Sequence, residues 1–198
     1  MRGQRTLGQY RAIDLGICAV LLAAFEFLLS RAGTAWFRQE AYVVSLTPLI
    51  TAVVMMRWGP WGAIHAALGG ALFVLFYGGR GAEWQLYAVY GIGNLAGLAG
   101  LILLRKPGRE SVRRSAWLTL GYGALVLLAM QTGRMLVALL FGMRQGLAGY
   151  YLTEVVTMLF TLVALWIVRR LDGMFEYQPD YLRRVRQESV SEEEGGSV

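Results

Sequence analysis

The sequence predicts an all-α, polytopic membrane protein with six transmembrane helices in one bundle and both chain ends in the cytoplasm. First, 56% of the 198 residues are hydrophobic and only 16% are charged, whereas soluble domains carry about 25% charged residues. Second, six apolar segments follow one another, each of about 17 or more residues, the length that crosses a hydrocarbon core of about 30 Å. Third, the basic residues gather in alternate connections between these segments.

The predicted spans cover residues 12–30, 41–57, 60–78, 84–104, 115–141 and 147–169. No small-x-small cleavage site follows the first segment, so it is expected to be a span rather than a cleaved signal peptide. Only Arg57-Trp-Gly-Pro60 separates the second segment from the third. Because Gly-Pro is a strong helix break, two spans are preferred there over one fused span, which would leave five in total.

Orientation follows from the distribution of lysine and arginine, which favours cytoplasmic loops. With a cytoplasmic N-terminus, the outside loops hold only Arg31, Arg38, Arg80 and Arg144. The inside segments hold fourteen basic residues: Arg2, Arg5, Arg11, Arg57, Arg105, Lys106, Arg109, Arg113, Arg114, Arg169, Arg170, Arg183, Arg184 and Arg186. We therefore expect a multi-pass protein of a prokaryotic plasma membrane, in contact with lipid rather than with nucleic acid.

Residues 1–171 are expected to form the transmembrane domain, and residues 172–198 a cytoplasmic tail with a disordered end. Residues 174–187 mix aromatics with arginine and resemble either a solvated extension of the last span or a short juxtamembrane helix. Enzyme signatures are missing: the sequence has no G-x-S-x-G elbow and no P-loop. One histidine and one cysteine build no familiar metal site. We expect neither catalysis nor a cofactor.

Two charged residues interrupt the last two spans, Arg134 in the fifth and Glu154 in the sixth. Each lies about seven residues from the outer end of its span, or roughly 10 Å below the outer surface. The short connection 142–146 makes these spans antiparallel neighbours, so the two charges are level and can meet. Ionised groups at such depth cost several kcal/mol and face the bundle interior or a cavity. The pair is either a structural ion pair that fixes helix register or part of an outward-facing pocket.

Other polar residues accompany the pair. Gln131 lies one turn from Arg134, Tyr150 lies one turn from Glu154, and Asn94 lies in the fourth span. Ala12, Gly16, Ala19 and Ala23 form a stripe of small residues on the first span, which either packs inside the bundle or docks another membrane subunit. Glu26 continues this stripe, so it should point sideways if the stripe docks a partner.

The chain resembles the substrate-binding S component of an energy-coupling factor (ECF) vitamin transporter. The resemblance covers about 190 residues and rests on six spans, on Ala19-Val-Leu-Leu-Ala23 as the family's A-x-x-x-A motif, and on Arg57-Trp-Gly-Pro-Trp-Gly-Ala63 as its tight turn. Leu171-Asp-Gly-Met-Phe-Glu176 resembles the ending of a subgroup without a firm substrate.

The resemblance implies high-affinity binding of a vitamin or related micronutrient near the outer surface, and delivery through a transmembrane coupling subunit driven by two cytosolic ATPases. Ala19 and Ala23 would then contact the coupling subunit. Residues that match the family's pocket by location are Trp36, Gln85, Asn94, Gln131, Arg134, Tyr150 and Glu154. Two alternatives stay open. One is a non-transporting membrane scaffold such as the rod-shape protein MreD, and the other, less favoured, is a self-sufficient small transporter or channel.

Overall fold

The computed structural model describes residues 6–36, 44–77, 83–143 and 151–195, without the side chains of Thr34, Trp36 and 189–195. Within these ranges the chain contains helices and their connections but no strand. Four helical stretches are long and apolar enough to cross a membrane: Leu7–Gly33, Thr47–Tyr77, Trp84–Arg114 and Ala116–Leu140, with a shorter apolar helix at Val155–Val168. The predicted all-α class with several membrane-length helices is confirmed.

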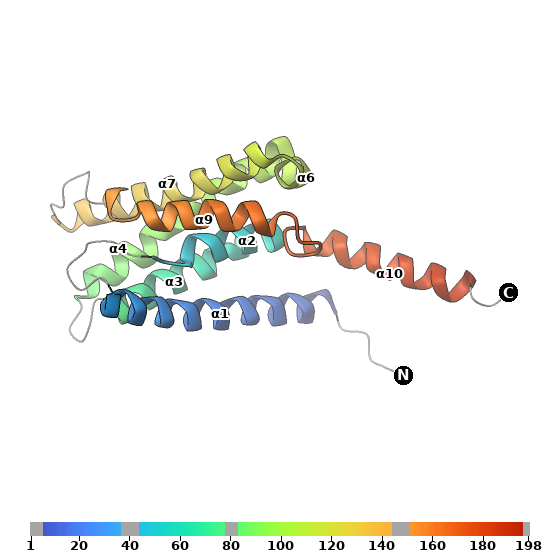
Figure 1. Cartoon of the computed structure of the whole chain (residues 1–198), viewed down its shortest axis with the longest axis horizontal. Helices are drawn as coiled ribbons and strands as arrows, with labels where there is room; N and C mark the ends of the chain where they lie inside the picture. The colour runs from blue at the N-terminus through green and yellow to red at the C-terminus, as the bar shows by residue number, and fades with distance from the viewer. Residues whose placement is uncertain (1–5, 37–43, 78–82, 144–150, 196–198) are drawn as a thin grey trace.

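The helices lie roughly parallel in one elongated bundle, with α1 (Leu7–Trp36) along one edge (Figure 1). The stretch Thr47–Tyr77 folds back on itself as α2 (Thr47–Trp58), the 3₁₀ turn η1 (Gly59–Trp61) and α3 (Gly62–Tyr77). Gly59 has a φ of +67°, a value that only glycine adopts readily. An added Cβ at Gly62 or Gly69 would overlap Met55 or Thr47. The two legs are therefore antiparallel and in close contact, as the Gly-Pro break predicted.

The boundaries of the second predicted span, 41–57, need adjustment, because α2 begins at Thr47 and has only 12 residues. Residues 44–46 are described and are not helical. Pro48 lies in the first turn of α2, where a missing N–H costs nothing. This placement of proline, rather than the apolar run that begins at 41, determines where the helix starts.

The predicted fourth span is helical but not uniform. It runs through α4 (Trp84–Asn94), the 3₁₀ segment η2 (Leu95–Gly100) and α5 (Leu101–Leu103) to η3 (Leu104–Gly108). Within η3 the chain kinks at Lys106, whose backbone is not helical (φ −140°, ψ 118°), before α6 (Arg109–Arg114) begins. Its glycines face α7 (Ala116–Leu140): a Cβ at Gly93 would lie 2.6 Å from the Cα of Arg134, and one at Gly100 would lie 2.6 Å from Val126. Glycine lets helix backbones approach closely in lipid, so the fourth span packs tightly against α7.

The C-terminal part departs from the predicted domain boundary at 171. After α9 (Val155–Val168) the chain turns back toward the bundle, and Phe175 is fully buried with its ring 6.3 Å from that of Tyr122. Glu176 and Gln178 are buried as well. The packed domain therefore extends past residue 171. The last helix, α10 (Gln178–Gly195), covers much of residues 174–187, for which the sequence left a short juxtamembrane helix open, and its arginines and glutamates are good helix formers.

Burial inverts the pattern of a soluble bundle. The centre is α2, in which Ala52, Val54, Met55 and Met56 are fully buried. Large apolar side chains cover the outside instead, among them Leu140, Trp117 and Val20, which are 85%, 84% and 70% exposed. Soluble monomers rarely expose contiguous apolar surface on this scale, whereas a lipid environment accommodates it.

Candidate functional site

Four of the residues predicted to line a site meet between the helices; we call them the polar cluster (Asn94, Gln131, Arg134 and Glu154). The Nη1 of Arg134 forms an ion pair with Glu154 Oε1, and the side-chain amide of Gln131 donates to the other carboxylate oxygen. Arg134 Nε donates to Asn94 Oδ1 at 2.6 Å. These residues are nearly enclosed, with whole-residue exposures of 2% for Arg134, 9% for Glu154, 6% for Gln131 and 0% for Asn94. The ion pair expected from helix rise and a short connection is present.

The polar cluster joins four parts of the bundle. Asn94 of α4 donates through Nδ2 to the carbonyl oxygen of Ala66 in α3 at 3.1 Å. The guanidinium of Arg134 lies over the ring of Tyr90, 4.8 Å from its centroid, a cation–π arrangement. The approach of α4 to α7 depends on Gly93 and Gly133, because a Cβ on either one would overlap the backbone of the other helix.

One acceptor oxygen in the polar cluster receives no hydrogen bond from the described residues. The Oε1 of Gln131 is buried and has no hydrogen-bond partner among the described residues. A buried polar atom without a partner costs about 1–3 kcal/mol, and native proteins keep such atoms where water, an ion or a ligand supplies the missing bond. The polar cluster therefore has an open acceptor for a hydrogen-bond donor.

A second buried carboxylate holds the start of α2. Glu26 Oε1 accepts hydrogen bonds from Ser45 Oγ at 2.5 Å, from the N–H groups of Leu46 and Thr47 at 2.9 and 3.1 Å, and from Thr47 Oγ1 at 2.9 Å. The N–H of Ser45 donates to Thr157 Oγ1 at 3.1 Å, which connects this point to α9. Glu26 is fully buried. It therefore points into the bundle, a direction that the sequence left open.

The sequence contained a signal for this cap. Ser45-Leu-Thr47-Pro48 places hydroxyl residues and a first-turn proline at the beginning of a helix, the usual signature of an N-terminus. A carboxylate is favoured there because the helix dipole presents partial positive charge. Glu26 supplies it from another helix, so only the tertiary structure connects the two.

The other predicted site residues do not join the polar cluster. Gln85 is half-buried in the first turn of α4, about 13 Å along the helix from Asn94. Tyr150 lies outside the described residues, and so does the side chain of Trp36 at the end of α1. The predicted partner-face residues Ala19 and Ala23 are half-buried on α1.

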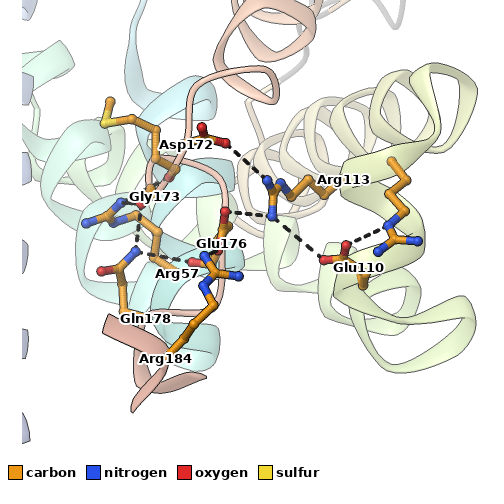
Figure 2. A network of polar contacts seen from close by, with 10 residues as sticks. Arg57, Glu110, Arg113, Asp172, Gly173, Glu176, Gln178 and Arg184 are labelled. Atoms are coloured by element: carbon orange, nitrogen blue, oxygen red, sulfur yellow. Dashed lines mark hydrogen bonds and ion pairs between the residues drawn. The ribbon is translucent and has the colours of Figure 1, made fainter. Parts of the chain in front are cut away.

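The end of the bundle formed by residues 57–62, 105–115 and 169–178, here named the arginine end, carries a second polar network (Figure 2). Arg57 binds Asp14 of α1 through Nε and Nη2 at 2.8 and 2.7 Å, and donates to the Gly173 carbonyl at 2.6 Å. Arg113 forms ion pairs with Glu176 at 2.6 Å, Asp172 at 3.4 Å and Glu110 at 3.9 Å. These contacts attach the segment after α9 to α2 and α6.

Two adjoining cavities lie at the arginine end. The smaller, of about 300 Å³, lies beside Phe175, Tyr177 and Tyr181 and holds equal numbers of arginines and acidic residues. The larger, of about 530 Å³, is here named the arginine groove; its walls are Glu110, Arg113, Arg114, Arg169, Arg170 and Arg184. The hydrogen bond and charge of Glu176 raise the pKa of Arg184, so that guanidinium remains charged. The positions of these arginines in the sequence gave no reason to group them, because they come from α6, from the end of α9 and from α10.

Among the described residues no three His, Cys, Asp or Glu side chains are grouped as a metal site. The chain matches no protein-family model, and no curated protein or solved structure is significantly similar to it.

Proposed function

We propose that this chain is a membrane receptor for a small polar micronutrient, of the type represented by the S components of ECF transporters. The polar cluster carries the proposal. An arginine, a glutamate and two amides converge from α4, α7 and the start of α9 inside a bundle of apolar helices. Ionisable residues at membrane depth are expensive and mark sites of substrate or ion handling more often than structure alone.

The depth of the cluster supports an outward-facing site. Arg134 lies six residues before the end of α7 at Leu140, about 9 Å along the helix axis. Glu154 immediately precedes α9 at the same end of the bundle. In the orientation that the arginine distribution favours, with six crossings and both termini cytoplasmic, this end faces the outside.

The chemistry of the cluster restricts the ligand. Arg134 and Glu154 balance each other, so a ligand with a large net charge would leave one of them uncompensated in a dry site. A compound that carries both donors and acceptors can insert between them instead. Its donor would meet Gln131 Oε1, the open acceptor. This describes a small polar metabolite such as a vitamin or its precursor.

Delivery across the membrane would use partner proteins, because the sequence has no ATP-binding loop. We place the coupling subunit, with two cytosolic ATPases, against the α1 edge near Ala19 and Ala23. The outer surface of α1 is apolar there, with Val20 exposed. Ala19→Leu should leave ligand binding unchanged and prevent co-purification of the ATPase subunits. Gly121→Leu, which also adds a leucine at an exposed position, but on α7 where a new Cβ would meet nothing within 4 Å, is the matched control.

The direct test is native mass spectrometry of protein purified in mild detergent from cells grown in rich medium. We expect one small-molecule adduct on the wild-type chain, absent from the Glu154→Gln and Arg134→Lys variants. Tyr122→Phe is the control, since it removes a buried hydrogen bond to the Ala52 carbonyl from the same helix, away from the polar cluster. An adduct that survives both cluster variants would remove Arg134 and Glu154 from the binding site.

A non-transporting scaffold of the MreD type is the second candidate, and one observation favours it: Arg134 and Glu154 already neutralise each other. The double variant R134M/E154L separates the two functions. Removing one partner of a buried pair costs about 3–5 kcal/mol, whereas replacing both by apolar residues is often neutral. A folded double variant that no longer carries the adduct supports a receptor. One that still carries it supports a purely structural pair.

A further inference from the structure

We propose that the arginine groove binds the phosphate-bearing headgroup of an anionic phospholipid. The groove lies at the start of α7 and the end of α9, at the opposite end of α7 from Arg134. It is therefore a separate site, and its occupant does not depend on what the polar cluster binds.

The first argument is charge. Five arginines and one glutamate line the groove. Three carboxylates pair with these arginines: Glu110 with Arg113 and Arg114, Glu176 with Arg113 and Arg184, and Asp172 with Arg113. Together the five arginines and three carboxylates carry a formal charge of +2. Among the described residues no carboxylate lies within ion-pair distance of Arg169 or Arg170. A wall of this kind requires an anion, and arginine matches phosphate oxygens through paired N–H donors.

The second argument is that the side chain of Arg169 is held in place by backbone carbonyl groups while one of its N–H donors has no partner among the described residues. Arg169 Nη1 lies 3.4 and 3.3 Å from the carbonyl oxygens of Arg113 and Arg114, which joins the end of α9 to the end of α6. The Nε of the same side chain is buried and has no hydrogen-bond partner among the described residues. Arg169 is therefore a cation fixed at the groove wall, and one of its donors has no partner among the described residues.

The third argument identifies the source of the phosphate. Arg170 lies over the ring of Trp166 at 4.4 Å, and the neighbouring Ile167 is exposed and apolar. Trp117 is 84% exposed three residues after Arg114. Tryptophan and arginine at the ends of apolar helices mark the headgroup level of a bilayer, so the groove opens where lipid phosphates lie. A soluble anion would need the arginines but not the apolar surface beside them, whereas a phospholipid uses both.

The experiment titrates the full chain in dodecyl maltoside with dioleoylphosphatidylglycerol or dioleoylphosphatidylcholine and counts bound lipids by native mass spectrometry. We expect phosphatidylglycerol to bind at least tenfold more tightly. Since each basic residue near anionic lipid changes affinity by roughly fivefold, R169Q/R170Q should weaken phosphatidylglycerol binding by roughly 25-fold. R114Q/R170Q changes two exposed side chains and should have a similar effect without disturbing the contacts of Arg169.

The matched control is R105Q/K106Q, which removes two exposed cations from the same end of the bundle without touching the groove. It should change affinity by less than twofold. Equal losses in the control and in R114Q/R170Q would reduce the effect to general surface charge and overturn the proposal. Inorganic phosphate at 10 mM should compete weakly with the lipid. Phosphate binding that depends on the same arginines, with no preference between the two lipids, would overturn the assignment to lipid.

Discussion

Replacement of Glu26 should loosen the start of α2 and reveal how strongly one buried carboxylate holds it. In Glu26→Ala the Leu46 N–H loses its acceptor, whereas the Thr47 N–H retains Ser45 Oγ at 3.1 Å. An unpaired buried donor costs about 1–3 kcal/mol, and the space left by the side chain adds about 1 kcal/mol more. The variant should therefore lose about 2–4 kcal/mol of unfolding free energy.

Glu26→Gln separates the charge from the hydrogen bonds. The amide oxygen can accept from the same donors, but the NH2 group takes the place of Oε2, which is buried without a hydrogen-bond partner among the described residues. The loss of the charged acceptor and the unpaired NH2 group together should cost about 1–3 kcal/mol. The unfolding free energy of both variants is measured by titrating SDS into the protein in mild detergent. Far-ultraviolet circular dichroism monitors the loss of helix. Glu83→Ala is the control, because this glutamate is exposed and makes no side-chain cap hydrogen bond at α4.

Hydrogen exchange locates the effect. The amide of Leu46 should exchange at least tenfold faster in Glu26→Ala, since 1.4 kcal/mol of local opening corresponds to a factor of ten. If Glu26→Ala is as stable as Glu83→Ala, or if exchange at Leu46 is unchanged, the carboxylate is not what stabilises the α2 terminus and the reasoning fails.

Two further predictions concern packing and the arginine end. Gly133→Ala should lower the unfolding free energy by about 1–3 kcal/mol in the same assay, because its Cβ would overlap the Gly93 carbonyl and force α4 away from α7. The control is Gly121→Ala, whose Cβ would meet nothing within 4 Å. It should leave the unfolding free energy unchanged or raise it slightly. Equal effects of the two substitutions would contradict the close contact. Asp14→Asn should cost about 1–3 kcal/mol by weakening the two hydrogen bonds from Arg57, and limited proteolysis after residue 171 should accelerate, because Arg57 also holds the Gly173 carbonyl. Unchanged proteolysis would mean that Arg57 does not hold this segment.

Several features were predictable because they depend on position along the chain. Apolar runs indicate where membrane-length helices lie, although not their exact bounds, and the Gly59-Pro60 break follows from backbone geometry that these two residues impose. The meeting of Arg134 with Glu154 follows from a rise of 1.5 Å per residue and a short connection between antiparallel helices. Gln131 was a candidate because it lies one turn from Arg134, and Asn94 because it is a polar residue in the fourth span that matches the location of the resembled family's pocket.

Other features depend on how each helix is rotated about its axis. In a soluble bundle the polar face identifies the outside, but in lipid both faces of a helix are apolar, so the pattern does not specify the rotation. Glu26 shows the consequence: the sequence left its direction open, with a sideways direction expected only if the small-residue stripe docks a partner, whereas it caps α2 inside the bundle. The burial of Phe175 was hidden in the same way, because a short polar segment follows the last apolar run.

The sequence by itself determined the class of the protein, the number of apolar segments, the hairpin break and the level at which two opposite charges lie. Only the tertiary structure decided which face of each helix is internal, which acceptor holds the start of α2, and which arginines gather in one groove. The physical reason is that hydropathy and rise per residue act along one helix. Rotation and side-chain partnership arise only when several helices pack together.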